Sequence, residues 1–338
     1  MTHTYVQIND PHVSDQPPRM RLPSYLDDVL AKLAAAVDFA NEHGADGIVI
    51  TGDLFHRKNA THTTHRTVQR VRDVLYRALM PVHIVPGNHD EANGGGLRGQ
   101  PLLSIPDGDR IHLLTGPSGV DPLLAGVPWD NAYERDGGVE VLAERIRDTR
   151  RPLVFAHAPI TNRPFPFGPE ANGWVLDREL DALLAGTHIG PTLLVAHGHM
   201  HGQQARTVQP SGITFSNPGA LSRGSVAEAD VERLPSIARI TYDGGVPGYT
   251  PVVEVTYHVV AHRPAAEVLR LEEHERDDVR ATAVERLAAS LAGEYAEVVD
   301  EDVLRAVLAR LERPEGIDEA TWAAGLRIAT AAIDGEEV

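Results

Sequence analysis

The sequence contains no cysteine among its 338 residues, which excludes disulfide bonds and metal sites built from thiolates. It also lacks an apolar run of about 18 residues, the length that a membrane-spanning helix needs. The segment from Met1 to Asp10 has the pattern of a strand rather than that of a signal peptide. We therefore expect a cytoplasmic protein without a membrane segment. The length suits one large or two moderate domains.

Positive charge is scarce as well. The chain has 31 basic and 48 acidic residues, a formal net charge of −17, and only two lysines, Lys32 and Lys58. Nonspecific affinity for nucleic acid comes mainly from neutralised phosphates, and the chain lacks the basic stripe that would supply it. Much of the negative charge lies late in the chain, between residues 267 and 278 and between residues 297 and 302.

Five short polar motifs each follow a short apolar run that has the pattern of a buried strand. The motifs are Asp10-Pro11-His12, Gly52-Asp53, Gly87-Asn88-His89-Asp90, His157 and Gly198-His199-Met200-His201. In open α/β sheets, ligands bind outside the carboxyl ends of the strands. Five strands that each end in a metal-capable residue therefore predict a single site.

The residue types in these motifs predict the chemistry of that site. Imidazole and oxygen ligands without thiolate suit manganese, iron or zinc better than calcium or copper(I). Asp10 and His12 are two residues apart at a strand end, so their side chains leave on one face and can bind one ion. Two cations about 3.5–4 Å apart would share a water that loses a proton at neutral pH and attacks phosphorus in line.

The ordered set of motifs resembles the calcineurin-like metallophosphoesterase superfamily over residues 5 to about 225. The resemblance implies two metal ions bridged by the Asp53 carboxylate. It assigns the first ion to Asp10, His12, Asp53 and His201, and the second to Asp53, Asn88, His157 and His199. It also implies that His89 assists the leaving oxygen. Asp90, beside it, is expected to orient the His89 imidazole and keep it protonated.

Three further features resemble the SbcD-type DNA-repair nucleases, the prokaryotic partners of SbcC. Gly52-Asp53 continues to His56, a Pro-Gly element at residues 218–219 leads to Arg223, and a strand pair and helical tail follow the core. The resemblance places His56 near the scissile phosphodiester and assigns Arg223 to substrate binding. Ala220 stands where the family usually has Ser. Two alternatives stay open: His56 could cap a helix beginning near Thr61, and the turn at residue 219 could be structural alone.

Apolar spacing outlines the fold. It predicts helices over residues 25–42, 61–79, 139–147 and 176–184, and late strands over 236–242 and 252–260. This alternation suits two packed sheets flanked by helices, which is the four-layer αββα sandwich that the resemblance implies. We expect residues 1–262 to form the α/β phosphoesterase (nuclease) domain. Residues 263–338 would form a small C-terminal cap or partner-docking region, with helices at 265–273, 279–291, 302–311 and 320–333.

The resemblance as a whole implies a manganese-dependent DNA exo/endonuclease, with iron or zinc as other possible metals. A hydroxide held between the two ions would attack the phosphodiester in line. The chain would be a homodimer acting in DNA repair or recombination with an SbcC-like ATPase. The loaded site is locally positive because bound cations dominate its electrostatics, but we expect weak DNA binding by the chain alone, with the ATPase supplying most of the grip.

Two other functions are alternatives to the nuclease. A phosphodiesterase acting on cyclic nucleotides or on nucleotide-linked diphosphates would share all five motifs but would not need His56, the Pro-Gly element or the tail. A non-catalytic scaffold would have a degraded site. The sequence argues against the scaffold, because all seven predicted ligands and His89 are present.

Overall fold

The computed structural model describes residues 1–57, 63–92, 96–163, 174–185, 192–226, 228–244 and 251–273. Met1–Leu269 form one compact unit and Arg270–Val338 a second. The helices predicted at 279–291, 302–311 and 320–333 lie outside the described residues, and the domain boundary after residue 262 stays a prediction. No helix in the described ranges combines the length and apolar character needed to cross a membrane.

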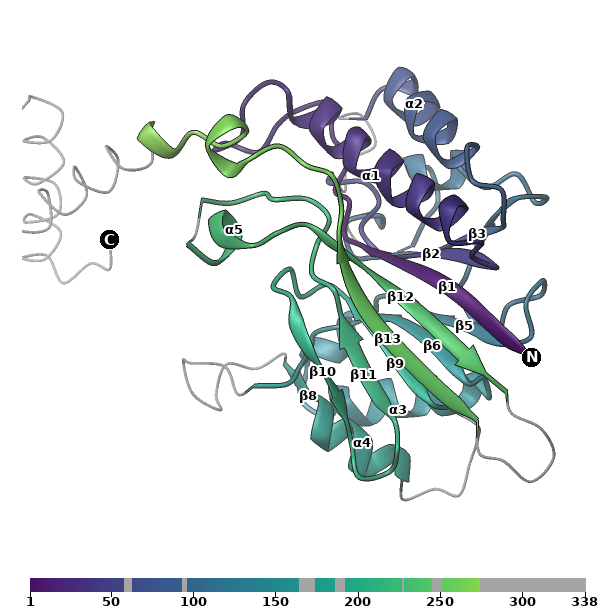
Figure 1. Ribbon diagram of the computed structural model, residues 1–338. Coiled ribbons are helices and arrows are strands. Elements are labelled where there is room, and N and C mark those ends of the chain that lie inside the picture. The colour runs from purple at the N-terminus through teal and green to yellow at the C-terminus, as the bar shows by residue number, and fades with distance from the viewer. Residues whose placement is uncertain are drawn as a thin grey trace, which may run out of the picture. The chain divides into compact units, whose positions relative to one another are not determined.

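Two large sheets form the centre of the first unit (Figure 1). One has the order β13-β12-β1-β2-β3-β4, with β1 to β4 parallel and with β12 and β13 each antiparallel to its neighbour. Its strands are β1 (Thr2–Asn9), β2 (Gly47–Thr51), β3 (Val82–Val85), β4 (Ile111–Leu113), β12 (Ser236–Asp243) and β13 (Val252–Val259).

The second sheet has the order β10-β11-β9-β6-β5, and only β10 runs antiparallel to its neighbour. Its strands are β5 (Leu124–Val127), β6 (Leu153–His157), β9 (Leu194–Gly198), β10 (Gln204–Val208) and β11 (Thr214–Asn217). A separate short pair joins β7 (Ile160–Thr161) to β8 (Val175–Leu176).

Helices cover the outer face of each sheet, so the layers are helix, sheet, sheet and helix (Figure 1). The first sheet is covered by α1 (Tyr25–Glu42) and α2 (His65–Leu75), and the second by α3 (Gly138–Thr149) and α4 (Asp177–Ala185). Apolar side chains also pack between the two sheets, in a core that includes Tyr5, Val49 and Phe155. The predicted four-layer αββα sandwich is thereby confirmed, apart from the C-terminal helices outside the described residues.

Most of the predicted elements agree closely with the structure. The helix over residues 25–42 has the predicted bounds, whereas the one predicted over 61–79 is shorter, because Thr64 caps α2 at its start. The helix predicted over 265–273 is wrong in part. A 3₁₀ turn, η4 (Ala265–Glu267), is followed by Val268 and Leu269, which turn inward and bond to the segment before α1. The remaining short elements are α5 (Glu228–Glu232), η2 (Pro101–Ser104) and η3 (Asn131–Glu134).

Two leucines allow a test of the packing between α1 and the first sheet. Leu33 is fully buried in that core, whereas Leu79 is 82% exposed. We expect Leu33→Ala to lower the free energy of unfolding by about 2–5 kcal/mol, because it leaves a cavity. Leu79→Ala should change it by less than about 0.5 kcal/mol. Urea unfolding followed by circular dichroism measures both, and equal losses would contradict the assigned core.

Candidate metal centre

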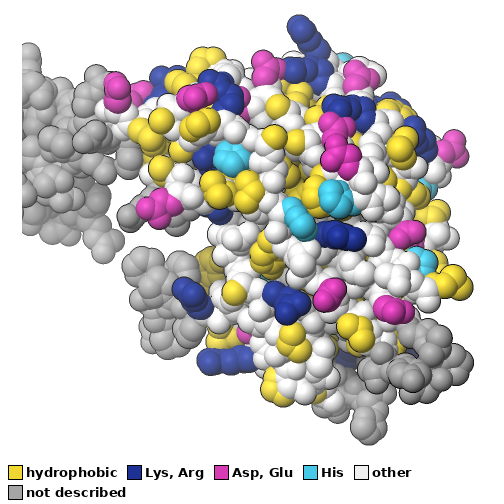
Figure 2. Space-filling view, in the orientation of Figure 1, with side chains coloured by type: hydrophobic (Ala, Val, Ile, Leu, Met, Phe, Trp, Pro, Cys, Tyr) yellow, Lys and Arg dark blue, Asp and Glu magenta, His cyan; other side chains and the backbone are white. Residues whose placement is uncertain are grey.

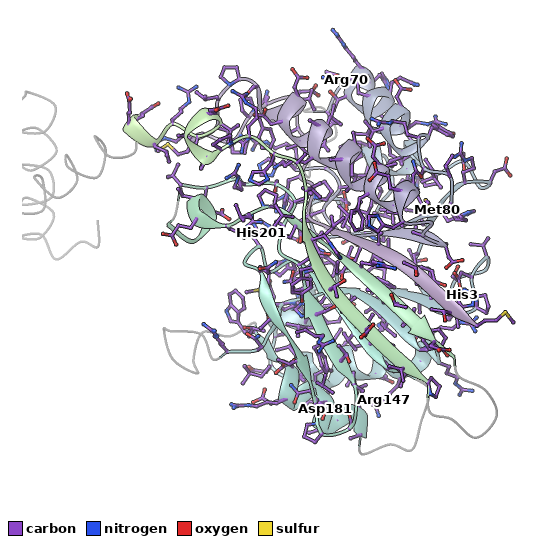
Figure 3. All side chains as sticks on the ribbon, viewed as in Figure 1. His3, Arg70, Met80, Arg147, Asp181 and His201 are labelled. Atoms are coloured by element: carbon purple, nitrogen blue, oxygen red, sulfur yellow. The ribbon has the colours of Figure 1, made fainter. Side chains whose placement is uncertain are left out.

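The five motifs meet where the carboxyl ends of the two sheets come together. Asp10, Asp53 and Asn88 follow β1, β2 and β3 of the first sheet, while His157 ends β6 and His199 follows β9 of the second. Figure 3 shows His201 near this junction, and His3, at the start of β1, at the far end of the same sheet. The strand ends therefore place all the predicted ligands in one site.

The first group of potential metal-ligand atoms includes the side-chain nitrogens of His12 and His201. The two Nε2 atoms are 3.0 Å apart, and His12 Nε2 is 3.6 Å from Asp53 Oδ2. Ligand-capable atoms of Asp10, His12 and His201 all lie within 4.8 Å of one another. This arrangement agrees with the four ligands predicted for the first ion.

A second group lies on the other side of Asp53. His157 Nε2 is 3.0 Å from Asn88 Oδ1 and 3.5 Å from Asp53 Oδ2. His199 Nδ1 is 3.2 Å from the same Asn88 oxygen. Asp53 Oδ2 faces both groups, which is the position that a bridging carboxylate requires. The assignment of each ligand to an ion stays a prediction.

The hydrogen bonds of His157 prepare its ring for a metal. Its Nδ1 lies 3.1 Å from the carbonyl oxygen of Thr51, and a carbonyl oxygen only accepts, so Nδ1 carries the proton. Nε2 is then the ring nitrogen that would bind a cation after losing its own proton, and it faces Asp53 and Asn88. Metal-ligating histidines in proteins are typically oriented in this way by a hydrogen bond from the second ring nitrogen.

The electrostatics of the site also suit cations. Burial and the charge of Asp53 raise the pKa of Asp10 to about 8, against the opposing effect of His157. Burial lowers the pKa of His157, but Asp53 and Asp10 outweigh it and raise the value to about 9. Negative charge buried this deeply needs positive partners. The donor set therefore fits two divalent cations, and the geometry does not select among manganese, iron and zinc.

The backbone at the ligands adopts an unusual conformation. Four of the ligands have positive φ, namely Asp10 (47°), His12 (50°), Asp53 (48°) and His199 (78°). Positive φ is uncommon for residues other than glycine, and such strain persists only where the surroundings impose it. Here the constraints include bonds from His12 N to Asp53 O (2.9 Å) and from His199 N to Asp10. These bonds fix the backbone at the ligands in the conformation that brings their side chains into one site.

Three of the motifs require glycine because a neighbouring group lies too close to leave room for a Cβ atom. A Cβ at Gly52 would lie 1.8 Å from His157 Nδ1, and one at Gly87 would lie 2.2 Å from Asp53 Oδ1. A Cβ at Gly198 would lie 2.2 Å from the Thr51 carbonyl oxygen. Each motif therefore needs its glycine because a ligand side chain, or the carbonyl that orients one, occupies the space of the missing methyl group.

His89 and His56 form a parallel pair beside His12. The His56 and His89 rings stack with centroids 5.5 Å apart and an 11° interplanar angle, and His56 Nδ1 is 3.3 Å from His12 Nδ1. His89 Nδ1 donates to the carbonyl oxygen of His56 at 2.6 Å, which leaves Nε2 as its second nitrogen, available to a substrate. The alternative that His56 caps the next helix is wrong, because Thr64 caps α2.

The predicted role of Asp90 is wrong. Its carboxylate accepts from the backbone N–H groups of Leu54, Phe55 and Gly87 at 3.0–3.2 Å, and the His89 imidazole bonds to His56 instead. Burial, followed by the charge of Asp53, raises the pKa of Asp90 to about 7. Asp90 therefore fastens the Gly52 and Gly87 loops to each other.

Arg223 does not reach the ligand cluster. Its guanidinium is buried and donates to the carbonyl oxygen of Arg263. A substrate contact by Arg223 stays a prediction. The Pro-Gly turn before it has a structural reason of its own, because Gly219 has φ +82° and its N–H donates to Asn217 Oδ1 at 2.7 Å.

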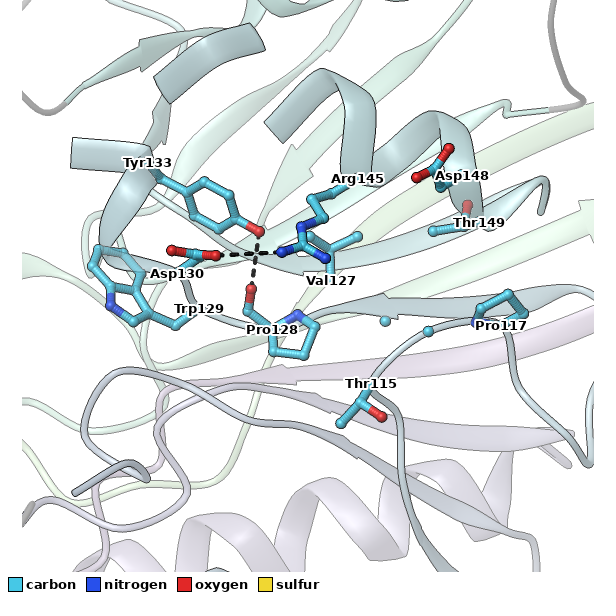
Figure 4. Close-up of a pocket in the computed structure, with 12 residues that line it drawn as sticks. Thr115, Pro117, Val127, Pro128, Trp129, Asp130, Tyr133, Arg145, Asp148 and Thr149 are labelled. Atoms are coloured by element: carbon cyan, nitrogen blue, oxygen red, sulfur yellow. Dashed lines mark hydrogen bonds and ion pairs between the residues drawn. The ribbon is translucent and has the colours of Figure 1, made fainter. Parts of the chain in front are cut away.

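Trp129 belongs to the site, although the sequence pattern did not indicate it. Its ring stacks on His199 with a centroid distance of 4.5 Å and an angle of 29°. Trp129 also lines a cavity of about 290 Å³ together with Tyr133 and Arg145 (Figure 4). Its position two residues after β5, at a strand end of the second sheet, was the available signal.

The fold and this cluster define a metal-dependent hydrolase. The chain matches the model of the calcineurin-like phosphoesterase family over residues 3–203, which is more than half of its length. The chain belongs to this family.

Individual relatives share low sequence identity with this chain. A probable cyclic nucleotide phosphodiesterase from Vesicomyosocius okutanii subsp. Calyptogena okutanii (strain HA) is 29% identical over 93 residues, which cover 28% of this chain and 36% of that protein. Among solved structures, TT1561 of Thermus thermophilus is 19% identical, with a TM-score of 0.43, over 77% of this chain and 100% of its own. A dimetal phosphatase from Danio rerio is 15% identical, with a TM-score of 0.42, over 77% and 99%.

Gly52→Ala should abolish metal binding, because the new methyl group would collide with His157. Gly44→Ala is the matched control: Gly44 also has positive φ (+58°), but nothing lies within 4 Å of a Cβ there. Both variants would lose about 1–2 kcal/mol of stability from backbone strain. Calorimetric titration with manganese separates the two effects, and tight binding by Gly52→Ala would refute the close-approach argument.

Metal affinity should rise with pH. In the absence of cations, His157 (pKa about 9) and Asp10 (pKa about 8) are protonated at neutral pH, and a cation has to displace these protons. The apparent affinity therefore increases from about pH 6 to about pH 9 and levels off above the higher pKa. Competition with a fluorescent chelator across this range measures the effect. An affinity independent of pH would contradict the protonated metal-free site.

Proposed function

We propose that the chain is a manganese-dependent nuclease that hydrolyses DNA phosphodiester bonds, of the SbcD type. The observation that carries the proposal is the pair of parallel imidazoles, His56 and His89, next to the ligand His12. Hydrolysis of phosphate esters requires the metal ligands and one such imidazole. A second imidazole three residues after Asp53 is the feature that the proposed branch adds.

The residues of the chain would divide the work as follows. The bound ions, held by the two ligand groups, would supply a nucleophile at neutral pH and neutralise the phosphoryl oxygens. The His56 carbonyl fixes the His89 ring so that Nε2 is left for the substrate. A protonated Nε2 can then donate to the leaving oxygen. His56, itself partly exposed, would contact the phosphodiester.

We also propose that the chain acts with protein partners. We expect a homodimer that acts with an SbcC-like ATPase, because the net charge of −17 makes tight DNA binding by the chain alone unfavourable. Residues 263–338 would form the cap or the docking element for that ATPase. DNA repair or recombination in the cytoplasm would be the setting.

A second candidate is hydrolysis of cyclic nucleotides. The relative named a probable cyclic nucleotide phosphodiesterase supports it, since 93 aligned residues are 29% identical. Such an enzyme needs the same metal ligands and His89 but has no need of His56. Variants of His56 therefore separate the two functions.

The test incubates the full chain and manganese with linear duplex DNA labelled at one 3′ end, and in parallel with cyclic nucleotides. We expect release of labelled nucleotide, abolished by a chelator and by Asp53→Ala. His89→Ala should retain both ions but lose about 10²–10⁴-fold in turnover, the usual contribution of a positioned proton donor. His65→Ala, an exposed histidine at the start of α2, is the control.

The outcomes distinguish the candidates. If His56→Ala reduces cleavage of DNA but the wild-type chain leaves cyclic nucleotides intact, the nuclease is supported. Intact DNA together with hydrolysis of cyclic nucleotides would replace the nuclease by the second candidate. Loss of the ions in His89→Ala would reassign His89 to a structural role.

A further inference from the structure

A second cavity, of about 240 Å³, lies among basic side chains outside the metal centre. It is bordered by residue 21, by the first half of α1, by residue 223, and by residues 261–263 and 268. In Figure 1 the chain after β13 runs beside the segment that leads into α1, and the bond from Leu22 N to Val268 O (3.1 Å) joins them. The charged side chains in its lining include Arg21, Asp28, Lys32, Arg223 and Arg263.

The basic side chains of this cavity are deeply buried. Arg21 is 1% exposed, and Lys32 and Arg223 are each 3% exposed. Charged groups are rarely buried to this extent without paired charges. Lys32 is also one of only two lysines in the chain, which otherwise uses arginine.

The cavity holds more positive than negative charge. Among the described residues that line it, Asp28 is the one acid, and its carboxylate is shared by Arg21 (3.3 Å) and Arg263 (3.2 Å). Arg263 also pairs with Glu267, beside the cavity, at 3.2 Å. Lys32 donates to the carbonyl oxygen of Leu221 at 2.7 Å, and Arg223 to that of Arg263. Within the described residues, no ion pair joins an acid to Lys32 or Arg223. These carbonyl oxygens carry no net charge, and the buried Arg223 Nε has no hydrogen-bond partner among the described residues. Asp28 and Asp230 act on the two basic groups without forming an ion pair with them.

Burial and mutual repulsion both disfavour the charged forms of these groups. The pKa of Lys32 lies well below its usual value, first because of burial and then because of the positive charges of Arg21, Arg223 and Arg233. The pKa of Arg223 is lowered by burial and by Arg21. An anion in the cavity would remove this repulsion.

We propose that this cavity binds a dianionic phosphate group, either inorganic phosphate or the terminal phosphate of a mononucleotide, at a site separate from the metal centre. Guanidinium and ammonium groups are the side chains that recognise phosphate, arginine through paired N–H donors and lysine as a point charge. The volume suits a phosphate group, since pockets that enclose a whole drug-sized ligand are about 300–1,000 Å³.

The site lies back to back with the metal centre. Lys32 and Arg21 bond to the carbonyl oxygens of Leu221 and Arg223. From the same segment, Leu221 N donates to Asn9 O at 2.7 Å and Ser222 Oγ to Asp10 O at 3.1 Å. Residues 221–223 therefore separate the basic cavity from the backbone of a predicted metal ligand. Phosphate bound to Lys32 would act on the segment that holds Asp10.

The test measures the thermal unfolding midpoint of the full chain with increasing inorganic phosphate or deoxyadenosine 5′-monophosphate, in the presence of a chelator. Sodium chloride at equal ionic strength corrects for screening. We expect the midpoint to rise with phosphate, because a ligand that binds only the folded state stabilises it. Lys32→Met and Arg223→Gln should bind about tenfold more weakly, since each removes a charge-assisted hydrogen bond.

Two controls keep the proposal falsifiable. Arg70→Gln removes an arginine that pairs with Asp27 on the exposed side of the helices and should bind phosphate like the wild type. Asp53→Ala disables the metal centre and should also retain phosphate binding. Lys32→Met should itself unfold no earlier than the wild type without phosphate, because replacing a buried charge by an apolar group of similar size is often stabilising.

Each result decides the question. A rise in the midpoint that depends on Lys32 and Arg223 but not on Asp53 supports the site, and the ligand that gives the larger rise identifies the source of the phosphate. A rise that is lost in Asp53→Ala and kept in Lys32→Met would place the phosphate at the metal centre and overturn the proposal. The absence of any rise with either ligand would overturn it as well.

Discussion

The buried carboxylates of Asp10 and Asp53 are the constraint on which the rest of the structure depends. Both lie at the junction of two sheets, where water cannot solvate them, so their negative charge needs nearby positive partners. Protonated His157 supplies positive charge from the second sheet, at 3.5 Å from Asp53 and 3.7 Å from Asp10. Bound cations would take over this role and displace its proton. The electrostatic requirement thus joins the carboxyl ends of both sheets into one functional unit.

Hydrogen bonds between uncharged groups also connect the two sheets next to this site. The Asn9 side-chain amide donates to the carbonyl oxygen of His197 (2.7 Å) and to Asn217 (2.9 Å), so β1 is tied to β9 and β11 beneath the site. Asn217 in turn donates to the carbonyl oxygen of Met200, within the loop that carries His199 and His201. Buried polar networks that are fully satisfied hold their members in one arrangement. The ligand loops are therefore positioned by a scaffold that contains no ligand itself.

Local patterns were sufficient to predict much of this molecule. Each apolar run ends at its ligand, so the site residues and most helices could be read from short segments; α1 was predicted with its actual bounds. Contacts between distant segments could not be read in this way. Asp90 stands beside His89 in the chain, yet it bonds to residues 54, 55 and 87, and Trp129 reaches His199 from another strand. Adjacency in sequence suggested the wrong partner for Asp90, because loop conformation decides where a short side chain points.

The distribution of charge across the unit follows from the same physics. Buried carboxyl groups are gathered at Asp10 and Asp53, and buried basic groups at Lys32 and Arg223, with residues 221–223 between them. Each cluster is unfavourable when it is buried alone, and each is favourable once an ion of opposite sign enters. Cations at one face and phosphate at the other would hold the intervening segment from both sides. Because Ser222 bonds to the Asp10 backbone, phosphate at the proposed site would alter the free energy of cation binding at the other, and such coupling would be reciprocal.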